Sequence, residues 1–500
     1  MRAALQPSFE PARQRLGDRW LLLLMLCLLG YALAGRGFAY LGVPPLFIGE
    51  ACLLAGLLVW MLTRGWSRIL QIGPAIMFFP LAAWGLFILA RNIGEYQLDA
   101  VRDAVIWGYG GFAIVVAALI VANPLRLPRM IEAYRVFTKI FLIGIPIAFV
   151  LYRYARTALP AWPWANTAII QVKEADALVH LGGILAFWMS DTSLINPRRP
   201  RGKSGWFWSA LLTLDIAMMG VIDRSGLVAF AAAMIICVIA RPRHGAFWRT
   251  TAMILCGAVL LWASQVNIEV PGGKGRNISW EQFVVSAKSI FGDSDRSAME
   301  GNKEWRLNWW KKIIDYTVHG EYFWTGKGFG VNLADDDGFQ VNADKSLRSP
   351  HSIHMSFLAR TGVPGLALWA MMHVVWFYTI ADTYLRARRR GQLRWCGLML
   401  FLFAYYTAFL INGSFDVYLE GPMGGIWFWT VFGVGVGAVW CWRYCPQILA
   451  DNEDDASRLT GGGSYGEFDE SSGRAQLLPA AGRRGPGLPL GAGAARSARA

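Results

Sequence analysis

Stretches of about 20 predominantly apolar residues recur along most of the chain, and this repetition limits the fold more than any other feature of the sequence. A helix crosses the hydrocarbon core of a bilayer in roughly 20 residues. Charged residues make up only 16% of the 500 residues, against about 25% in soluble domains. The stretches lie at residues 20–35, 45–62, 74–90, 104–122, 137–152, 175–190, 206–222, 225–240, 250–265, 363–384, 395–412 and 423–442. The sequence therefore predicts an all-α polytopic membrane protein with about 12 transmembrane helices.

Positive charges alternate between the segments that connect these stretches. One set of alternate segments, which includes the N-terminal segment and residues 386–394, carries about three times as many Lys and Arg residues as the other set. Cytoplasmic loops are enriched in positive charge, so we expect both termini of this multi-pass protein in the cytoplasm. The same bias accounts for the net charge of +14, and nucleic acid is not an expected partner.

The spacing of the stretches divides the chain into five expected parts. They are a cytoplasmic N-terminal segment (1–19), nine spans (20–265), a large external loop (266–361), three spans (362–445) and a cytoplasmic tail (446–500). The tail is rich in Gly, Ala, Pro and Ser and has few aromatic residues. Such a composition buries too little apolar surface to fold, so the tail is predicted to be disordered.

The middle of the external loop has the periodicity of an amphipathic helix, over residues 302–318. Its apolar residues recur at helical spacing, and they are Trp305, Trp309, Ile313 and Tyr316. Two interpretations remain open. The tryptophans anchor the helix at the outer membrane surface, with its cations facing lipid phosphates, or Arg306 beside this face belongs to a binding site.

Two polar motifs follow in the same loop. The run from Thr325 to Gly330 is rich in glycine, but it lacks the spacing of a phosphate-binding P-loop, and a plain turn is favoured. The acidic run Asp335–Asp337 offers three carboxylates to a divalent cation. Adjacent carboxylates do not point at one centre, however, and a solvated loop is favoured. No metal site is predicted.

The segment around His351 has the pattern of a helix start. Ser349 is a good N-cap and Pro350 suits the first helical position. His351 would then lie in the first turn and His354 one turn later, with the short helix ending near Gly362. The positive end of a helix disfavours an imidazolium ion, so a histidine there is suited to act as a general base. A surface histidine without a catalytic role is the alternative.

Arg224 stands at the outer junction of two apolar stretches. An ionisable group at membrane depth often lines a substrate path, and a guanidinium offers a rigid fork to phosphate oxygens. A structural pair with a carboxylate, or an extended side chain that reaches the headgroups, is the alternative. The charge bias places Arg224, Arg306 and His351 at the same outer face.

Three motifs together resemble the O-antigen ligase and O-antigen polymerase family of bacterial membrane glycosyltransferases, between Gly220 and Trp429. Residues 223–226 are similar to its Ser-Arg-Ser/Gly motif. Residues 305–310, followed by 326–330, resemble its arginine–tryptophan helix and glycine turn, and residues 351–366 resemble its His-Asn-x-Tyr-Leu signature. The departures from the family pattern are Asp223 for Ser, Ser352 for Asn and His354 for Tyr.

This resemblance implies a helical architecture of the lipid-donor (GT-C type) glycosyltransferases. It implies en bloc transfer of a glycan from undecaprenyl diphosphate to a hydroxyl of lipid A-core or another glycan or lipid acceptor, at the outer face of the bacterial inner membrane among its lipids. The reaction would invert the anomeric carbon and need neither a metal nor another cofactor.

The resemblance also implies roles for individual residues. Arg224 and Arg306 would bind the diphosphate, and His351 would take the proton of the acceptor hydroxyl. His354 remains the alternative base, and the secondary candidates are Arg348, Arg360 and Lys312. The alternative functions are a polymerase of the same family and a secondary transporter, for which Asp215 and His373 would be the residues near the midplane.

Overall fold

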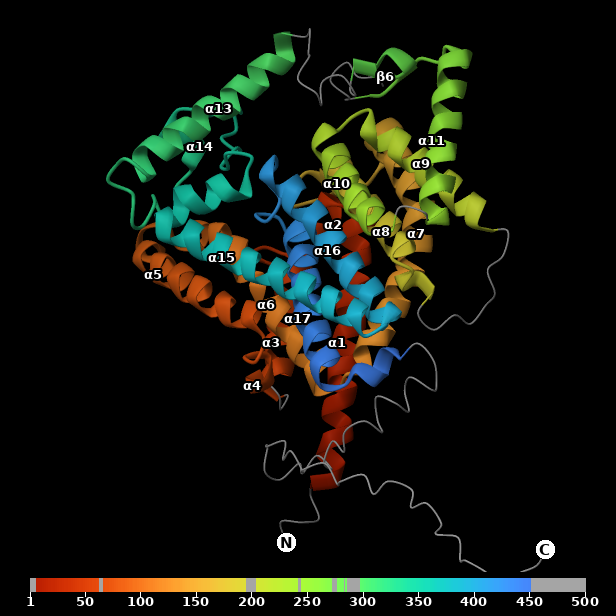
Figure 1. The fold of residues 1–500 in the computed structure, drawn as a ribbon. Coiled ribbons are helices and arrows are strands. Elements are labelled where there is room, and N and C mark those ends of the chain that lie inside the picture. Colours follow the sequence, from red (N-terminus) through yellow and green to blue (C-terminus); the bar gives the residue numbers. More distant parts are fainter. Residues whose placement is uncertain are drawn as a thin grey trace, which may run out of the picture. The chain divides into compact units, whose positions relative to one another are not determined.

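The computed structural model describes residues 6–62, 66–194, 204–241, 244–271, 277–282, 284–285 and 297–450. Among these residues the chain is mostly helical and contains seven helices that are long and apolar enough to cross a membrane (Figure 1). They are α1 (Gln6–Ala34), α5 (Gly73–Gly108), α7 (Arg126–Tyr154), α11 (Gly245–Ser264), α15 (Ile353–Arg389), α16 (Leu393–Ser414) and α17 (Pro422–Tyr444). This agrees with the predicted class of a polytopic helical membrane protein.

Five further helices overlap the remaining predicted stretches. They are α3 (Ile48–Leu62), α6 (Gly110–Ala122), α8 (Glu174–Met189), α9 (Ser204–Gly220) and α10 (Arg224–Ala240). A helix thus overlaps each of the twelve predicted stretches, although these five are shorter than the seven candidate spans. The boundaries differ more than the number, because hydropathy detects the apolar part of a helix and not its polar ends. Helix α1 begins at Gln6, within the segment expected to precede the first span.

Apart from α13 and α14, which are described below, the remaining regular elements are short. They are α2 (Arg36–Ala39), α4 (Trp66–Ile69), the 3₁₀ helices η1 (Arg156–Ala158), η2 (Thr192–Leu194) and η3 (Pro446–Leu449), and three antiparallel hairpins, β1 (Gly42–Val43) with β2 (Leu46–Phe47), β3 (Ala161–Trp162) with β4 (Thr167–Ala168), and β5 (Ile268–Glu269) with β6 (Asn277–Ile278). Helix η3 is the beginning of the predicted tail, and Trp395 donates a hydrogen bond to its Pro446 carbonyl at 2.8 Å. Residues 451–500 of that tail lie outside the described residues.

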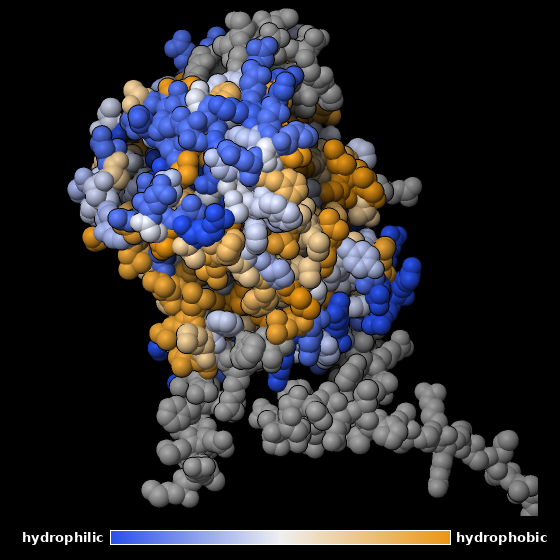
Figure 2. Space-filling view, turned by 90° about the vertical axis from the view of Figure 1, so that its left-hand side faces the viewer, coloured by the Kyte–Doolittle hydropathy of each residue, from blue (hydrophilic) through white to orange (hydrophobic). Residues whose placement is uncertain are grey.

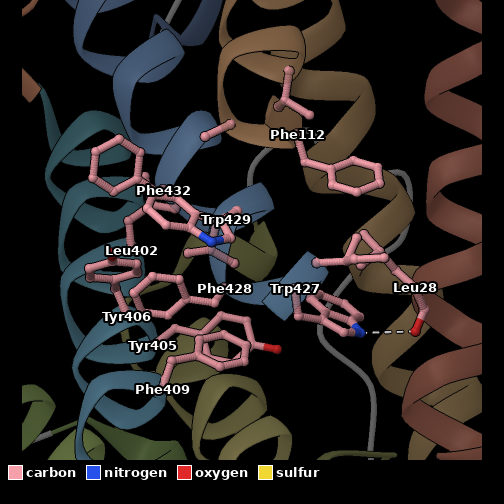
Figure 3. Close-up of a cluster of buried hydrophobic side chains, with 14 of the residues drawn as sticks. Leu28, Phe112, Leu402, Tyr405, Tyr406, Phe409, Trp427, Phe428, Trp429 and Phe432 are labelled. Atoms are coloured by element: carbon pink, nitrogen blue, oxygen red, sulfur yellow. Dashed lines mark hydrogen bonds between the residues drawn. The ribbon is translucent and has the colours of Figure 1, made fainter. Parts of the chain in front are cut away.

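The core of the unit formed by residues 1–449 is built around α16 and α17. Helix α17 packs against α6, and α16 packs against α8, α10 and α15. Figure 3 shows aromatic rings of α16 and α17 interleaved, with Trp427 of α17 donating a hydrogen bond of 2.9 Å to the Leu28 carbonyl of α1. Gly433 permits the close approach of α6, because a Cβ atom there would lie 2.4 Å from the Ala113 carbonyl oxygen. Helix α11, in contrast, exposes most of its apolar side chains, as a lipid-facing helix does.

The segment predicted as an external loop, residues 266–361, contains a helical module with a core of its own, which we call the external module. Its elements are α13 (Ser297–Thr317), which confirms the helix predicted over 302–318, and α14 (Leu333–Asp337). The buried residues of this small core are Trp309, Ile313, Leu333, Ala334, Leu347, Leu358 and Ala359. Figure 2 shows hydrophilic residues gathered on the upper part of this face and hydrophobic residues below them. The module is therefore a polar cap beside the apolar helices.

Candidate functional site

The ends of four helices and the side of a fifth meet in one cluster of charged side chains. Lys173 precedes α8, Asp223 caps α10 and His351 precedes α15, while Asp416 follows α16 and Arg306 comes from α13. We call these five residues, together with Asp176 and Asn412, the junction cluster. Helix ends suit such a site, because their unpaired backbone groups and polar caps already lie at the edge of the apolar core.

Asp416 is the centre of the junction cluster. Its Oδ2 atom pairs with Lys173 Nζ, and its Oδ1 atom lies 3.9 Å from His351 Nδ1. Burial is the largest influence and would raise the pKa of Asp416, but Lys173 and His351 together outweigh burial and hold this pKa well below its usual range. Burial would lower the pKa of Lys173, but the carboxylates of Asp176 and Asp416 outweigh burial and raise it. The two groups therefore stay ionised together near neutral pH.

Arg306 joins the external module to this cluster. Its Nη1 atom donates a hydrogen bond of 2.8 Å to the Phe415 carbonyl, next to Asp416. Burial is the largest influence on this guanidinium and lowers the pKa of Arg306, against the opposing charges of Asp416 and Asp223. A guanidinium remains protonated despite such a shift, because its intrinsic pKa is above 12. The two predicted site residues therefore contact neighbouring residues of the loop that follows α16. Arg306 contacts Phe415, and His351 contacts Asp416.

The start of α10 also lies at the junction cluster. Asp223 accepts hydrogen bonds from Gly226 N at 3.2 Å and from Ser225 Oγ at 2.6 Å, which caps the helix. Ser225 Oγ also lies 3.2 Å from Asn412 Oδ1, and Asn412 Nδ2 donates to Asp176 at 3.4 Å. Arg224 is the half-buried first residue of α10, between two residues that take part in these contacts. The departure of Asp223 from the family pattern therefore has a structural explanation as an N-cap.

The prediction that a helix begins at Pro350 is wrong. Helix α15 begins at Ile353 with Ser352 as its N-cap, and His351 precedes it in a left-handed conformation with φ of 54°. Ser349 does not cap the helix, since its Oγ lies 3.1 Å from Ser356 Oγ. The Asp416 carboxylate, and not the first turn of a helix, is therefore the charge that His351 faces. The predicted break at Gly362 is confirmed as a kink within α15, at φ of 70°.

His354 has a different environment from His351. Its Nδ1 atom accepts a hydrogen bond of 3.2 Å from Trp369 Nε1, and its Nε2 atom lies 3.0 Å from Ser414 Oγ. Ser414 donates its own hydroxyl hydrogen to the Leu410 carbonyl, so it accepts from His354. Both ring nitrogens of His354 are thus engaged, and neither has a lone pair left for a proton.

The secondary candidates lie outside the junction cluster. Arg348 and Arg360 both pair with Asp103 of α5, at 3.0 and 2.8 Å. Lys312 donates a hydrogen bond of 2.7 Å to the Asp337 carbonyl. Of the predicted site residues, the structure brings Arg306 and His351 together and places Arg224 at the adjoining helix start. The three secondary candidates lie elsewhere.

The polar motifs of the loop have packing functions. Asp337 is buried, accepts a hydrogen bond of 2.7 Å from Trp309 Nε1 and pairs with Lys327, so the prediction of a solvated loop is wrong for this carboxylate. Trp309 is 0% exposed and stacks on Phe339 with ring centroids 5.4 Å apart. The interpretation of Trp309 as a membrane anchor is therefore wrong. Within the described ranges, no group of three or more His, Cys, Asp or Glu residues is arranged to hold a metal ion.

Sequence reasoning missed Lys173, Asp176 and Asp416. The available signal was weak, because each residue lies at the end of an apolar stretch, where a charge is common. Only the tertiary arrangement shows that these ends meet at His351.

A family model described as O-antigen ligase matches part of this chain. The match covers residues 208–370, which include the start of α10, the external module and the start of α15. No curated protein matches the chain. The resemblance found in the three motifs is thus confirmed over residues 208–370, which match the O-antigen ligase family.

Proposed function

We propose that this protein transfers a glycan en bloc from undecaprenyl diphosphate to a hydroxyl of a lipid A-core or another glycan or lipid acceptor. The reaction would take place at the outer face of the bacterial inner membrane, without a metal or other cofactor. The observation that carries the proposal is the convergence of His351, Asp416 and Arg306 at the start of the helix that bears Arg224. These residues supply a base and cations, which glycan transfer from a diphosphate requires.

His351 is suited to be the base. With Nδ1–H directed at the Asp416 carboxylate, the lone pair of the imidazole is on Nε2. Nε2 makes no hydrogen bond within the part of the chain that the structure describes. It can therefore accept the acceptor proton, a contribution of about 10²–10⁴-fold to the rate. Asp416 would stabilise the imidazolium that forms, as a carboxylate does in hydrolytic triads.

The reaction is a single displacement. The acceptor oxygen attacks the anomeric carbon, and its proton moves to His351 Nε2. The bond between that carbon and the phosphate oxygen breaks, and the diphosphate leaves with the electron pair. Attack from the face opposite the leaving group inverts the anomeric configuration.

Arg306 and Arg224 would stabilise the charge that grows on the leaving diphosphate. The Nη1 atom of Arg306 is fixed by the Phe415 carbonyl, whereas its buried Nε atom makes no hydrogen bond to a described residue. Fixed donors aimed at developing charge often accelerate a reaction more than any other feature of an active site. Of the nearby carboxylates, Asp416 is paired with Lys173, and Asp223 accepts the capping hydrogen bond of α10.

The product of a reaction with purified undecaprenyl-diphosphate glycan tests this function. We expect glycan on a separate acceptor, and we expect transfer to continue in the presence of a strong chelator. The Arg224→Ala and His351→Ala variants should insert into the membrane and lose transfer. A lengthened lipid-linked glycan would instead identify a polymerase, and normal transfer by both variants would contradict the site.

A further inference from the structure

A buried carboxylate outside the junction cluster connects three segments of the chain. Asp103 lies near the end of α5 and is 5% exposed. Its Oδ2 atom lies 2.8 Å from Arg360 Nη1, and it accepts hydrogen bonds from Arg348 Nη2 at 3.0 Å and from Gly330 N at 2.9 Å. One oxygen atom therefore joins α5 to the glycine turn, to the segment before His351 and to α15. We call these four residues the Asp103 clamp.

The two guanidinium groups extend the clamp to the backbone. Arg360 is fully buried, and its Nη1 and Nη2 atoms donate to the carbonyls of Val331 at 3.2 Å and Arg348 at 3.4 Å. Arg348 donates to the Gly330 carbonyl at 2.8 Å. Since Arg360 is fully buried and Arg348 is half-buried here, the negative charge of Asp103 is what makes their burial tolerable.

The glycine turn lies directly on α5. Gly328 and Gly330 have φ of 84° and 100°, where other residues are strained. A Cβ atom at Gly330 would lie 2.1 Å from the Cβ atom of Tyr96, and one at Gly328 would lie 2.4 Å from Asn92 Oδ1. The turn thus brings the Gly330 amide to Asp103 and serves as a docking surface between the external module and α5.

The clamp is close to His351 along the chain. Arg348 precedes His351 by three residues, and between them the Pro350 carbonyl accepts a hydrogen bond of 2.8 Å from Trp310 Nε1 of α13. The left-handed backbone of His351 is therefore fixed by Arg348 on one side and by the Ser352 cap of α15 on the other.

We propose that Asp103 is a positioning residue, which holds the segment bearing His351 in place through Arg348 and Arg360. Both arginines then act in this clamp and not as ligands of the diphosphate. The inference rests on the proposed glycan transfer, and it concerns residues that do not touch the reacting atoms.

Transfer kinetics of five purified full-length variants test the clamp. They are Asp103→Asn, Asp103→Glu, Arg348→Gln, the double variant Asp103→Asn/Arg348→Gln, and the control Asp99→Asn. Asp99 lies one turn earlier on α5, is 52% exposed and approaches the same Arg348 at 3.8 Å. We expect Asp103→Asn and Arg348→Gln each to lower kcat by about 10²-fold, as a misplacement of about 1 Å can do. The KM for the lipid donor should stay within about threefold, and the control should keep its kcat within the same range.

Two comparisons separate a positioning role from other roles. The double variant should lose no more activity than either single variant, because both changes break one unit. Asp103→Glu, which restores the charge, should recover part of kcat. If Arg348 instead binds the diphosphate, Arg348→Gln will raise the donor KM and Asp103→Asn will leave kcat near that of the control, and either result overturns the inference.

A readout without catalysis keeps this inference separate from the proposed function. Lys345 is exposed in the segment that the clamp holds, so trypsin should cleave there faster in Asp103→Asn than in Asp99→Asn. Faster cleavage with no transfer by the wild type would support the clamp and contradict the function. Equal cleavage of Asp103→Asn and Asp99→Asn, together with normal transfer by Asp103→Asn, would contradict the clamp and support the function. Asp103→Asn is replaced by Arg348→Gln if it does not fold, because Arg348 has a partly exposed side chain. The kinetic test and the trypsin test then both compare Arg348→Gln with Asp99→Asn.

Discussion

The chemistry proposed for His351 depends on the charge of one neighbour. Asp416 can orient the imidazole only while it is ionised, and burial works against that state. Lys173 supplies the opposing charge, although it lies far from His351 in the sequence and belongs to the start of another helix. A lysine without any contact to substrate thus determines whether the base has a usable partner.

This dependence predicts an altered pH profile for Lys173→Gln. The folded-state pKa of Asp416 is depressed, so in the wild type its charge is lost only as the pH falls below the usual carboxyl range. Without Lys173, burial should raise the pKa of Asp416 above its usual range, so Lys173→Gln should lose transfer at a higher pH than the wild type as the pH falls. Initial rates between about pH 4.5 and 8 measure this acid limb. An acid limb that coincides with that of the wild type would show that Lys173 does not control Asp416.

At the scale of elements, the sequence predicted the helices better than their ends. The periodic Trp and Ile residues of α13 identify a helix because one apolar face must be buried. The start of α15 was misplaced because Ser349, a good cap by type, contacts Ser356, and Ser352 caps the helix instead. Local residue preferences favoured both serines, and tertiary contacts decided between them.

The burial of Trp309 predicts that α13 depends on it for its position. Replacing this side chain with alanine leaves a cavity against Phe339 and removes one hydrogen bond to the buried Asp337, at a cost of about 3–5 kcal/mol to the module. Because α13 carries Arg306, Trp309→Ala should also reduce glycan transfer. Amide hydrogen exchange across residues 303–317 would measure the loosening. The matched control is Trp324→Ala, since Trp324 is 67% exposed, and equal exchange in the two variants would argue against this packing role.

At the scale of the whole molecule, hydropathy and charge bias predicted the helical membrane class, because both follow directly from the solvent that surrounds the chain. They could not predict the junction cluster. Lys173 and Asp416 are 243 positions apart in the printed sequence, and no local pattern links two charges that become neighbours only when α8 and α16 pack together. The motifs identified Arg224, Arg306 and His351 since these lie within the family match.

The proposed orientation makes a prediction of its own. In intact cells, a cysteine at the exposed position of Lys345 should react with a membrane-impermeant maleimide, because the proposed orientation places the external module outside the cell membrane. A cysteine at Arg389, at the end of α15, should react only after lysis. The unsubstituted protein is the background control for its seven native cysteines. The opposite labelling pattern would place the junction cluster on the cytoplasmic side and contradict glycan transfer at the outer face.

The most direct measurement of the central claim compares His351→Gln with His354→Gln. Glutamine keeps hydrogen-bonding groups but cannot take a proton, and the two histidines are three residues apart in the sequence. With purified undecaprenyl-diphosphate glycan and acceptor, His351→Gln should slow transfer by about 10²–10⁴-fold, while His354→Gln should stay within about tenfold of the wild type. Equal rates for His351→Gln and the wild type, or a greater loss in His354→Gln, would contradict the assignment of His351 as the base.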